Sequence, residues 1–165
     1  MSVFIRCGDI AKAINESKYT SVKDFLCSEF EVDTKRKEVM YEGEVTEKYI
    51  RQYYESQTGY KVYVPERTIY KGVVKGRADG LIIGEDGGVE FKLMNDFEDD
   101  EIIPDHFYQM YGYMFLYDKS WWDYVRVSKT GFRIDVRRIY FDKEIWENTQ
   151  LKIELFISHF CKKNG

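Results

Sequence analysis

The chain has few of the residues that cross-link or interrupt a polypeptide. Its 165 residues include only 3 cysteines, 2 prolines and 12 glycines. So little proline and glycine excludes a collagen-like or low-complexity protein. The cysteines are widely spaced and form no CxxC pair, which argues against a disulfide framework or a zinc ribbon. We therefore expect Cys7, Cys27 and Cys161 to be free, buried thiols.

Long apolar runs and a secretion signal are also missing. No uninterrupted apolar stretch approaches the roughly 20 residues that cross a bilayer. The first residues lack the basic start, apolar run and small-residue cleavage site of a signal peptide. Since 44% of the residues are hydrophobic, the chain can bury a core of its own. These patterns predict one folded, intracellular domain over residues 1–165 that neither enters a membrane nor is secreted.

A net positive charge is missing as well. The 25 Lys and Arg residues face 29 Asp and Glu residues, for a net charge of -4, which argues against binding of nucleic acid by bulk charge alone. Five of the carboxylates stand between Asp96 and Glu101 without a cation among them, and the rest of the chain holds 24 acidic residues against 25 basic ones. The negative charge is thus concentrated in one short segment.

Apolar periodicity predicts an α/β (α+β) fold. Helices are expected over residues 9–15, 21–29, 44–55 and 104–117, and a closing helix from residue 143. Segments rich in Val, Ile, Thr and Tyr predict strands over 60–70, 73–83, 89–93, 122–128 and 132–140, with a hairpin loop at 84–88. This order predicts a central mixed β-sheet of about five strands flanked by helices.

The last two strands alternate apolar and polar residues. The alternation places Val125, Val127, Ile134 and Val136 inward, and it places three cations outward, namely Arg126, Arg133 and Arg137. We expect this basic face to follow a nucleic-acid backbone together with Lys71, Lys75 and Arg77. Aromatic residues such as Trp121 or Trp122 are expected to be exposed and to stack on unpaired bases.

Charged residues also stand inside two neighbouring strands. Asp79 lies in the second strand, and Glu90 and Lys92 lie on the third, where alternation points them to one face and Phe91 to the other. With the hairpin tip near Asp86, Asp79 and Glu90 face each other. Carboxylates at the roughly 5 Å of a cross-strand pair repel unless a cation lies between them. The pattern predicts a divalent-ion site.

Hard oxygen ligands favour Mg²⁺ or Mn²⁺, and Mg²⁺ completes its coordination with water and phosphate oxygens. A phosphodiester is therefore the expected substrate, with Lys92 positioned to orient or deprotonate a water nucleophile. An Asp-Gly turn and a solvated Glu-x-Lys face are common by themselves. Only their combination on adjacent strands favours the metal site.

Glu47 lies at the border of the apolar arc of the helix over 44–55. At 100° per residue the apolar residues span 0° to 180°, and Glu47 falls at about 200°. A carboxylate there can be held firmly and still reach a cleft. An i,i+4 ion pair with Arg51 is the alternative role for Glu47.

Asp79, ten intervening residues and Glu90-Phe91-Lys92 resemble the PD-(D/E)XK nuclease core, with Ala78 at the family's Pro position. The segment from Gly43 to Glu47, with Arg51, Glu55 and Thr58-Gly59, is similar to a helix of the phage lambda-type exonucleases, a branch of viral recombination exonucleases. Residues 108–114 are similar to that branch's helix with a glutamine and a methionine. The resemblance runs from about Gly43 to Tyr140 and implies a restriction-endonuclease-like fold.

Carried over residue by residue, the resemblance implies that Asp79, Glu90 and the Phe91 backbone carbonyl ligate the metal and that Lys92 activates water. Glu47 matches a glutamate that acts near a second metal or the nucleophile. Gln109 matches a glutamine that orients Lys92 or the water, and a core glutamine bonded to backbone is the alternative. Arg51, Lys75 and Arg77 join the expected nucleic-acid contacts.

The resemblance divides the chain into an N-terminal helical part (1–40), a catalytic core (43–141) and a closing helix (143–161). Residues 5–14 are similar to a helix that grips a 5′-phosphate, although the usual serine falls at Gly8, and Arg77 stands where a small hydroxyl residue is frequent.

The implied protein is a Mg²⁺-dependent (or Mn²⁺-dependent) nuclease that hydrolyses DNA, a lambda-type exonuclease of viral or mobile-element origin in the host-cell cytoplasm. RNA is the alternative substrate, and the resemblance leaves room for a ring or dimer and for a single-strand-annealing or recombination partner. A structure-selective endonuclease and a catalytically inactive DNA-binding protein are the alternative functions.

Overall fold

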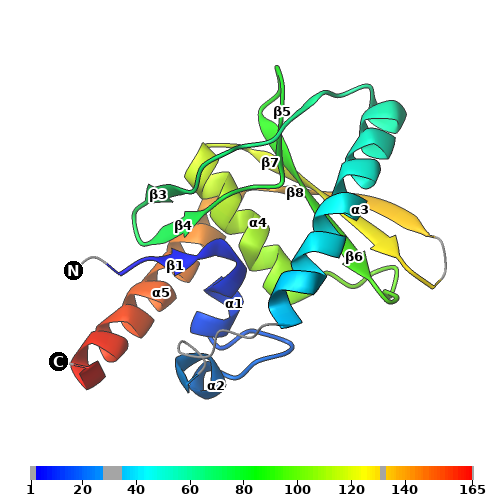
Figure 1. Cartoon of the computed structure of the whole chain (residues 1–165). Helices are drawn as coiled ribbons and strands as arrows, with labels where there is room; N and C mark the ends of the chain where they lie inside the picture. Colours follow the sequence, from blue (N-terminus) through cyan, green and yellow to red (C-terminus); the bar gives the residue numbers. More distant parts are fainter. Residues whose placement is uncertain (1–2, 28–34, 131–132, 165) are drawn as a thin grey trace.

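The computed structural model describes residues 3–27, 35–130 and 133–164, and its strands form two sheets (Figure 1). The larger sheet has the order β2-β5-β6-β7-β8, with β2 Val62–Tyr63, β5 Gly80–Ile82, β6 Gly87–Met94, β7 Trp121–Ser128 and β8 Ile134–Tyr140. Strands β6 and β7 run parallel and the other neighbours run antiparallel. The predicted mixed sheet of about five strands is thus confirmed.

The smaller sheet has three short strands in the order β1-β4-β3, namely β1 Ile5–Arg6, β4 Val74–Gly76 and β3 Ile69–Lys71. Strand β1 pairs in parallel with β4. Strand β1 is thereby hydrogen-bonded to a segment about 70 residues further along the chain.

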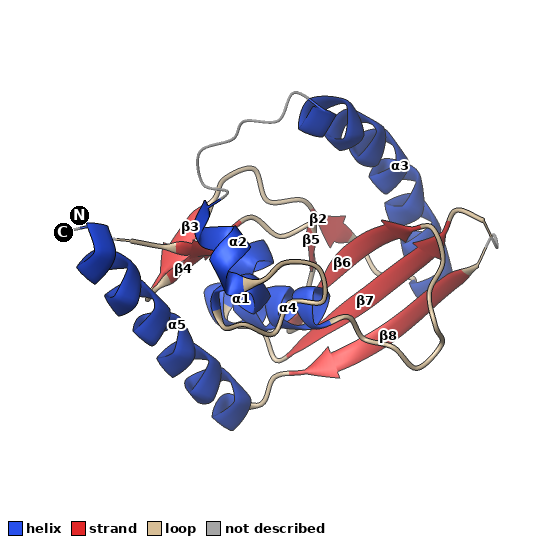
Figure 2. Cartoon of the chain, turned by 90° about the horizontal axis from the view of Figure 1, so that it is seen from below, coloured by secondary structure: helices blue, strands red, loops and turns tan. Residues whose placement is uncertain are grey.

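Helices cover both faces of the larger sheet. Ile50 and Tyr54 of α3 (Lys35–Thr58) pack with Phe91 and Val125, whereas α4 (Pro104–Tyr117) packs with Trp122. Since residues 122 and 125 of β7 differ in parity, they point to opposite faces of the sheet. Figure 2 shows α1 (Ile10–Ala13), α2 (Val22–Cys27) and α5 (Lys143–Asn164) on the side of α4, away from α3. The 3-10 helix η1 (Cys7–Asp9) precedes α1.

Two predicted strands are each divided in the structure. The segments expected as strands over 60–70 and 73–83 form β2 with β3 and β4 with β5, and the second break falls at residues 77–79. Val74 belongs to the core beneath α4 and Ile82 to the core beneath α3. Because the chain passes from one layer to the other, it cannot continue as one strand. Asp79 therefore precedes β5 instead of lying within a strand.

The helices differ from their predictions mainly in length. Helix α3 begins at Lys35, before the predicted start, and Tyr49 and Tyr53 are 66% and 45% exposed, so its buried arc is narrower than expected. The first helix ends at Ala13. The expected end of the second, at 28–29, lies outside the described residues, as do the side chains of Cys27 and Cys161. Cys7 is a free, buried thiol.

No helix in the described ranges is both long and apolar enough to span a membrane.

Candidate active site

The register of β5 and β6 brings the two predicted carboxylates together. Gly80 is paired with Val89, so Asp79, one residue before β5, stands next to Glu90. The Phe91 amide donates a hydrogen bond to Asp79 Oδ2 at 2.9 Å. On the same face of β6, Lys92 Nζ lies 3.0 Å from Glu90 Oε1. The predicted juxtaposition of these charged residues is therefore present in the structure.

Glu90 is buried to 2% exposure, and its Oε2 atom has no hydrogen-bond partner among the described residues. Burial, and then the charge of Asp79, raise the pKa of Glu90 to about 8. Burial also raises the pKa of Asp79, although Lys92 opposes the effect. A buried polar atom without a partner and two adjacent carboxylates are both unfavourable unless a cation is bound between them.

Lys92 is held as an ammonium group beside these carboxylates. Burial alone would lower its pKa, but the charges of Glu90 and Asp79 outweigh burial and raise the pKa of Lys92. The single cation cannot satisfy both carboxylates, because Glu90 Oε2 remains without a partner among the described residues. When both carboxylates are ionised, their negative charge exceeds the charge of Lys92, and a bound divalent ion would favour this ionised state.

The donor set fits a hard divalent cation. The described residues contain no group of three or more His, Cys, Asp or Glu side chains arranged to hold a metal. An ion at Asp79 and Glu90 would thus complete its coordination with a backbone oxygen, water or substrate, as Mg²⁺ does in phosphate-processing sites. The Phe91 backbone carbonyl lies between Glu90 and Lys92 in sequence, and its role as a ligand stays a prediction.

Glu47 reaches the same site from α3. It is partly buried, and burial, followed by the charge of Asp79, raises its pKa to about 7, against the opposing effects of Arg51, Arg77 and Lys92. The border position of Glu47 on the helix therefore places it within electrostatic reach of Asp79.

Gln109 reaches the site from α4, and its Nε2 donates to the Tyr113 hydroxyl at 3.2 Å. Gln109 also shares a cleft with Lys92. The hydrogen bond of Gln109 to the Tyr113 side chain differs from the alternative role, a core glutamine bonded to the backbone.

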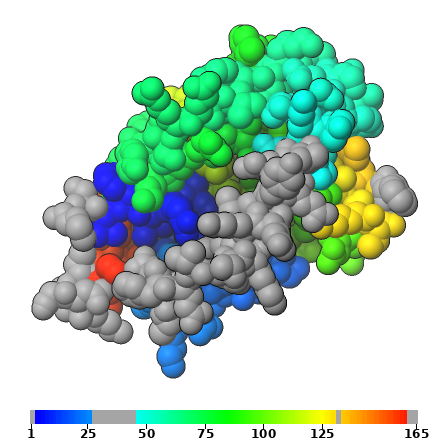
Figure 3. Space-filling view, viewed as in Figure 1, coloured from blue at the N-terminus to red at the C-terminus, as the bar shows by residue number. Residues whose placement is uncertain are grey.

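The cleft has a volume of about 800 Å³ and is lined by the N-terminal segment, the β3–β4 region and α4. In Figure 3 the N-terminal segment (blue) lies directly below the green surface of the chain that follows α3. Five of the lining residues are cations: Arg6, Lys12, Lys75, Arg77 and Lys92.

Three of these cations already have a carboxylate partner, and for Lys92 that partner is Glu90. Asp9 lies 2.7 Å from Arg6 Nε and 3.0 Å from Lys12 Nζ. Among the described residues, Lys75 and Arg77 have no ion pair and remain available to an anionic ligand.

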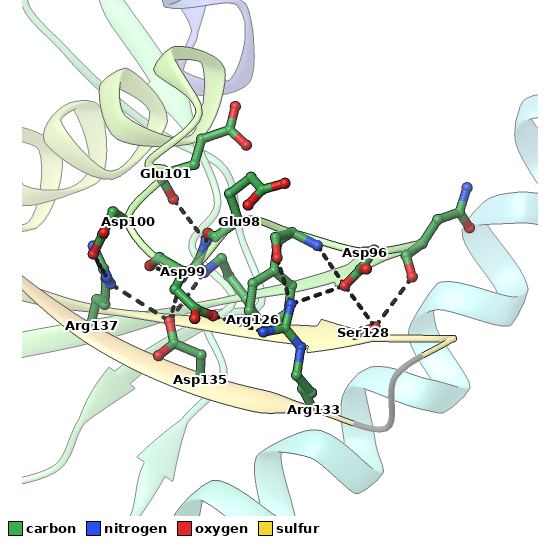
Figure 4. A network of polar contacts seen from close by, with 12 residues as sticks. Asp96, Glu98, Asp99, Asp100, Glu101, Arg126, Ser128, Arg133, Asp135 and Arg137 are labelled. Atoms are coloured by element: carbon green, nitrogen blue, oxygen red, sulfur yellow. Dashed lines mark hydrogen bonds and ion pairs between the residues drawn. The ribbon is translucent and has the colours of Figure 1, made fainter.

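The prediction that Arg126 points to solvent is wrong. Its side chain is 1% exposed, because the loop between β6 and α4 folds over the central strand β7. The guanidinium donates to the carbonyl oxygens of Glu98, Asp99 and Glu101 at 2.9, 3.0 and 2.8 Å and to the carboxylate of Asp135 at 2.6 Å (Figure 4). Arg126 is therefore a residue that fastens the loop, with no surface left to contact DNA.

The same loop also forms ion pairs with the other two arginines of the predicted basic face. Arg133 pairs with Asp99 and Asp96 at 2.7 and 3.0 Å, and Arg137 pairs with Asp100 at 3.2 Å (Figure 4). The acidic segment 96–101 thus neutralises cations of its own chain.

The expected orientations of four further side chains are also wrong. Ile134 and Val136, expected inward, are 40% and 46% exposed, because β8 is an edge strand. Trp121 and Trp122 are buried within the sheet's two cores and cannot stack on bases.

No family model matches the sequence, and no curated protein does. Solved structures do match it. The alkaline exonuclease LHK-Exo of Laribacter hongkongensis, in complex with dAMP, has a TM-score of 0.77 at 18% identity, over 97% of this chain and 89% of that one. A second structure of the same exonuclease has a TM-score of 0.74 at 17% identity, with the same coverage of both chains. A phage-related exonuclease of Haemophilus somnus 129PT has a TM-score of 0.70 at 12% identity, over 97% of this chain and 94% of that one.

The chain has the fold of these exonucleases. This result confirms the fold that the sequence resemblance implied. Sequence reasoning named Asp79, Glu90 and Lys92 as candidate site residues and likened residues 5–14, with Arg6, to a phosphate-binding helix, but it missed His106 as a residue of the cleft. No sequence signal joins His106 to the strands, because α4 reaches the cleft only through tertiary packing.

Proposed function

We propose that the protein is a divalent-cation-dependent nuclease that hydrolyses phosphodiester bonds of DNA, and that it acts as an exonuclease. The proposal is carried by one observation: Asp79 and Glu90 are brought together beside Lys92, with a buried carboxylate oxygen left without a partner among the described residues. The likeness in fold to exonucleases supports it, as does dAMP, a deoxynucleoside monophosphate, in one of those structures.

A bound Mg²⁺ or Mn²⁺ would supply Lewis-acid activation of water and charge stabilisation at the phosphate. In this proposal Asp79 and Glu90 hold the ion, together with the Phe91 carbonyl. The ammonium group of Lys92 orients the attacking water and offsets negative charge on the phosphate. Glu47 acts at a second ion or at the nucleophile.

The cleft supplies the path for the substrate. Lys75 and Arg77 line it and have no ion-pair partner among the described residues, so both can contact phosphate oxygens. At the sheet's far edge Arg133 and Arg137 are paired with the acidic loop. We therefore place the DNA in the cleft and not along β8.

Incubation of linear and covalently closed circular DNA with Mg²⁺, Mn²⁺ or EDTA tests this function. We expect cleavage of linear DNA only when a divalent ion is present. Asp79→Asn and Glu90→Gln keep the shape of each side chain but remove the charge that holds the ion, so each should lower the rate at least about 100-fold. Asp86→Asn, in the exposed hairpin loop, is the matched control and should retain activity.

Absence of cleavage under every condition, by a sample shown to be folded, would overturn the proposal. DNA binding without cleavage would then indicate a binding protein. Equally rapid cleavage of circular DNA would overturn the exonuclease assignment and favour a structure-selective endonuclease.

A further inference from the structure

His106 is the third residue of α4 and lines the cleft beside Lys92 and Gln109. The proposed mechanism does not use this histidine. The ring is only partly buried, and one edge of it is bound to the protein. The other edge can therefore face a substrate.

The bound edge of the ring is held by Tyr124. The Nδ1 atom of His106 lies 2.5 Å from the Tyr124 hydroxyl, and the two rings meet edge to face with centroids 5.6 Å apart. Tyr124 is fully buried and is paired with Glu90 in the parallel register of β6 and β7. His106 is thus anchored to the residue next to a proposed metal ligand.

This contact determines which ring nitrogen carries the proton. Within the described residues the Tyr124 hydroxyl has one hydrogen-bond partner, Nδ1 of His106. If Nδ1 carried a proton, the buried hydroxyl proton would have no acceptor, which is costly. The hydroxyl therefore donates to Nδ1, and the proton of a neutral imidazole resides on Nε2.

The imidazole remains neutral at physiological pH. Burial lowers the pKa of His106 to about 3, and the nearby charge of Lys92 acts in the same direction. A neutral donor can approach a phosphate in a cleft that already holds several cations without adding to their mutual repulsion.

We propose that His106 presents its Nε2–H to the cleft and donates a hydrogen bond to an oxygen of the substrate phosphate. The inference rests on the proposed nuclease function and adds a substrate-contacting residue to it. Lys92 and His106 would contact the phosphate from two different elements, β6 and α4. One contributes a charge, and the other contributes a directed neutral donor.

Two variants of His106 separate this role from a structural one. His106→Phe keeps an aromatic ring against Tyr124 but removes the donor, so kcat should fall about 10- to 100-fold, as expected for loss of a bond to a charged group. KM should change less than about threefold. His106→Gln can place an N–H near the position of Nε2 and should recover most of the lost kcat. Tyr108→Phe, on α4 but outside the cleft lining, is the matched control.

Nitrogen NMR of histidine-labelled protein provides a readout that needs no cleavage. The chain contains only 2 histidines, His106 and His159, so His106→Gln assigns the signals. We expect a neutral ring protonated at Nε2, and a shift of this Nε2–H resonance when a short DNA oligonucleotide is added in EDTA. A ring protonated at Nδ1, or no shift on binding, would overturn the inference.

The two proposals fail in different ways. A wild-type protein that cleaves no DNA defeats the nuclease function, and the NMR experiment then decides the role of His106 alone. An active wild type whose kcat is matched by His106→Phe defeats only the inference about His106.

Discussion

Glu90 illustrates how one residue can be costly to the fold and useful to the site. Its carboxylate is buried beside Asp79, and Lys92 contacts only one of its two oxygens. Residues whose pKa values are shifted by burial and by a like charge cluster at functional sites. Its contact with Lys92, which lines a basic cleft, is therefore what distinguishes Glu90 from a structural carboxylate.

The raised pKa of Glu90 predicts a pH dependence of stability in EDTA. Between its ordinary pKa of 4.5 and about 8, the folded protein binds a proton that the unfolded chain releases. Glu47 and Asp79, whose pKa values are also raised, act in the same direction, and His106, whose pKa is lowered, opposes them only below its ordinary pKa of 6.5. The free energy of unfolding should therefore fall as the pH rises through this window. Calorimetry at several pH values checks the trend. A rise in stability over this range would contradict it, provided that the Asp86→Asn control follows the wild type.

Glu90→Gln should remove the destabilisation that the buried carboxylate causes at higher pH, and it should also abolish cleavage. The amide has no charge to lose or gain, so the variant should gain stability over the wild type in EDTA, increasingly from pH 5 to pH 8. A gain of about 1 kcal/mol corresponds to a rise in Tm of about 2–4 °C for a chain of this size. The measurement is thermal unfolding in EDTA, and a lower Tm for Glu90→Gln at pH 8 would show that the charge stabilises the fold.

At the scale of elements, the loop from Asn95 to Ile103 connects β6, with Glu90 and Lys92, to α4, with Gln109. Arg126 binds three of its carbonyl groups, and the guanidinium lies 4.2 Å from the ring centroid of Phe97, which is buried. Because Arg126 is the register partner of Lys92, it ties the loop to the strand at the level of the site. The loop therefore sets the position of α4 relative to β6.

Arg126→Met should be strongly destabilising. It removes the three hydrogen bonds to loop carbonyl groups and the ion pair with the partly exposed Asp135, so the loss of stability should exceed about 2 kcal/mol. Arg133→Met, the same replacement at an exposed member of the network, should change stability little. Urea unfolding compares the two variants. Equal losses for both would show that the loop is held by its surface ion pairs and not by Arg126.

For the whole molecule, the net charge of -4 conceals a separation of charge. The acidic segment 96–101 is paired with Arg133 and Arg137, whereas Lys75 and Arg77 lie in the cleft. Local charge in a cleft can attract a polyanion even when the total charge is negative. Lys75 and Arg77 therefore give the cleft a local positive charge although the total charge is negative.

Salt-dependent binding tests this separation. Lys75→Ala and Arg77→Ala should each weaken the binding of a DNA oligonucleotide in EDTA and reduce the slope of log K against log salt by about 1. Arg137→Ala should change neither quantity, because Asp100 already pairs with Arg137. Fluorescence anisotropy over a series of KCl concentrations measures both. A similar loss for Arg137→Ala would place the DNA on the strand face instead.

The sequence by itself determined the features that depend on neighbours along the chain. The start of α4 at Pro104, the pair of strands near the C-terminus and the approach of Asp79 to Glu90 follow from turn residues, alternation and a short hairpin. These interactions span few residues, so their geometry is nearly fixed by local rules.

Only the tertiary structure decided which side of each element is covered. Alternation assigned Arg126 and Val125 correctly to opposite faces of β7, but it could not show that the acidic loop would bury the arginine. The cleft likewise requires β1, β4 and α4 to meet, and His106 joins it only through that packing. Whether a surface is buried by another segment depends on contacts between residues that are distant in sequence. The periodic pattern of a single strand or helix carries no information about those contacts.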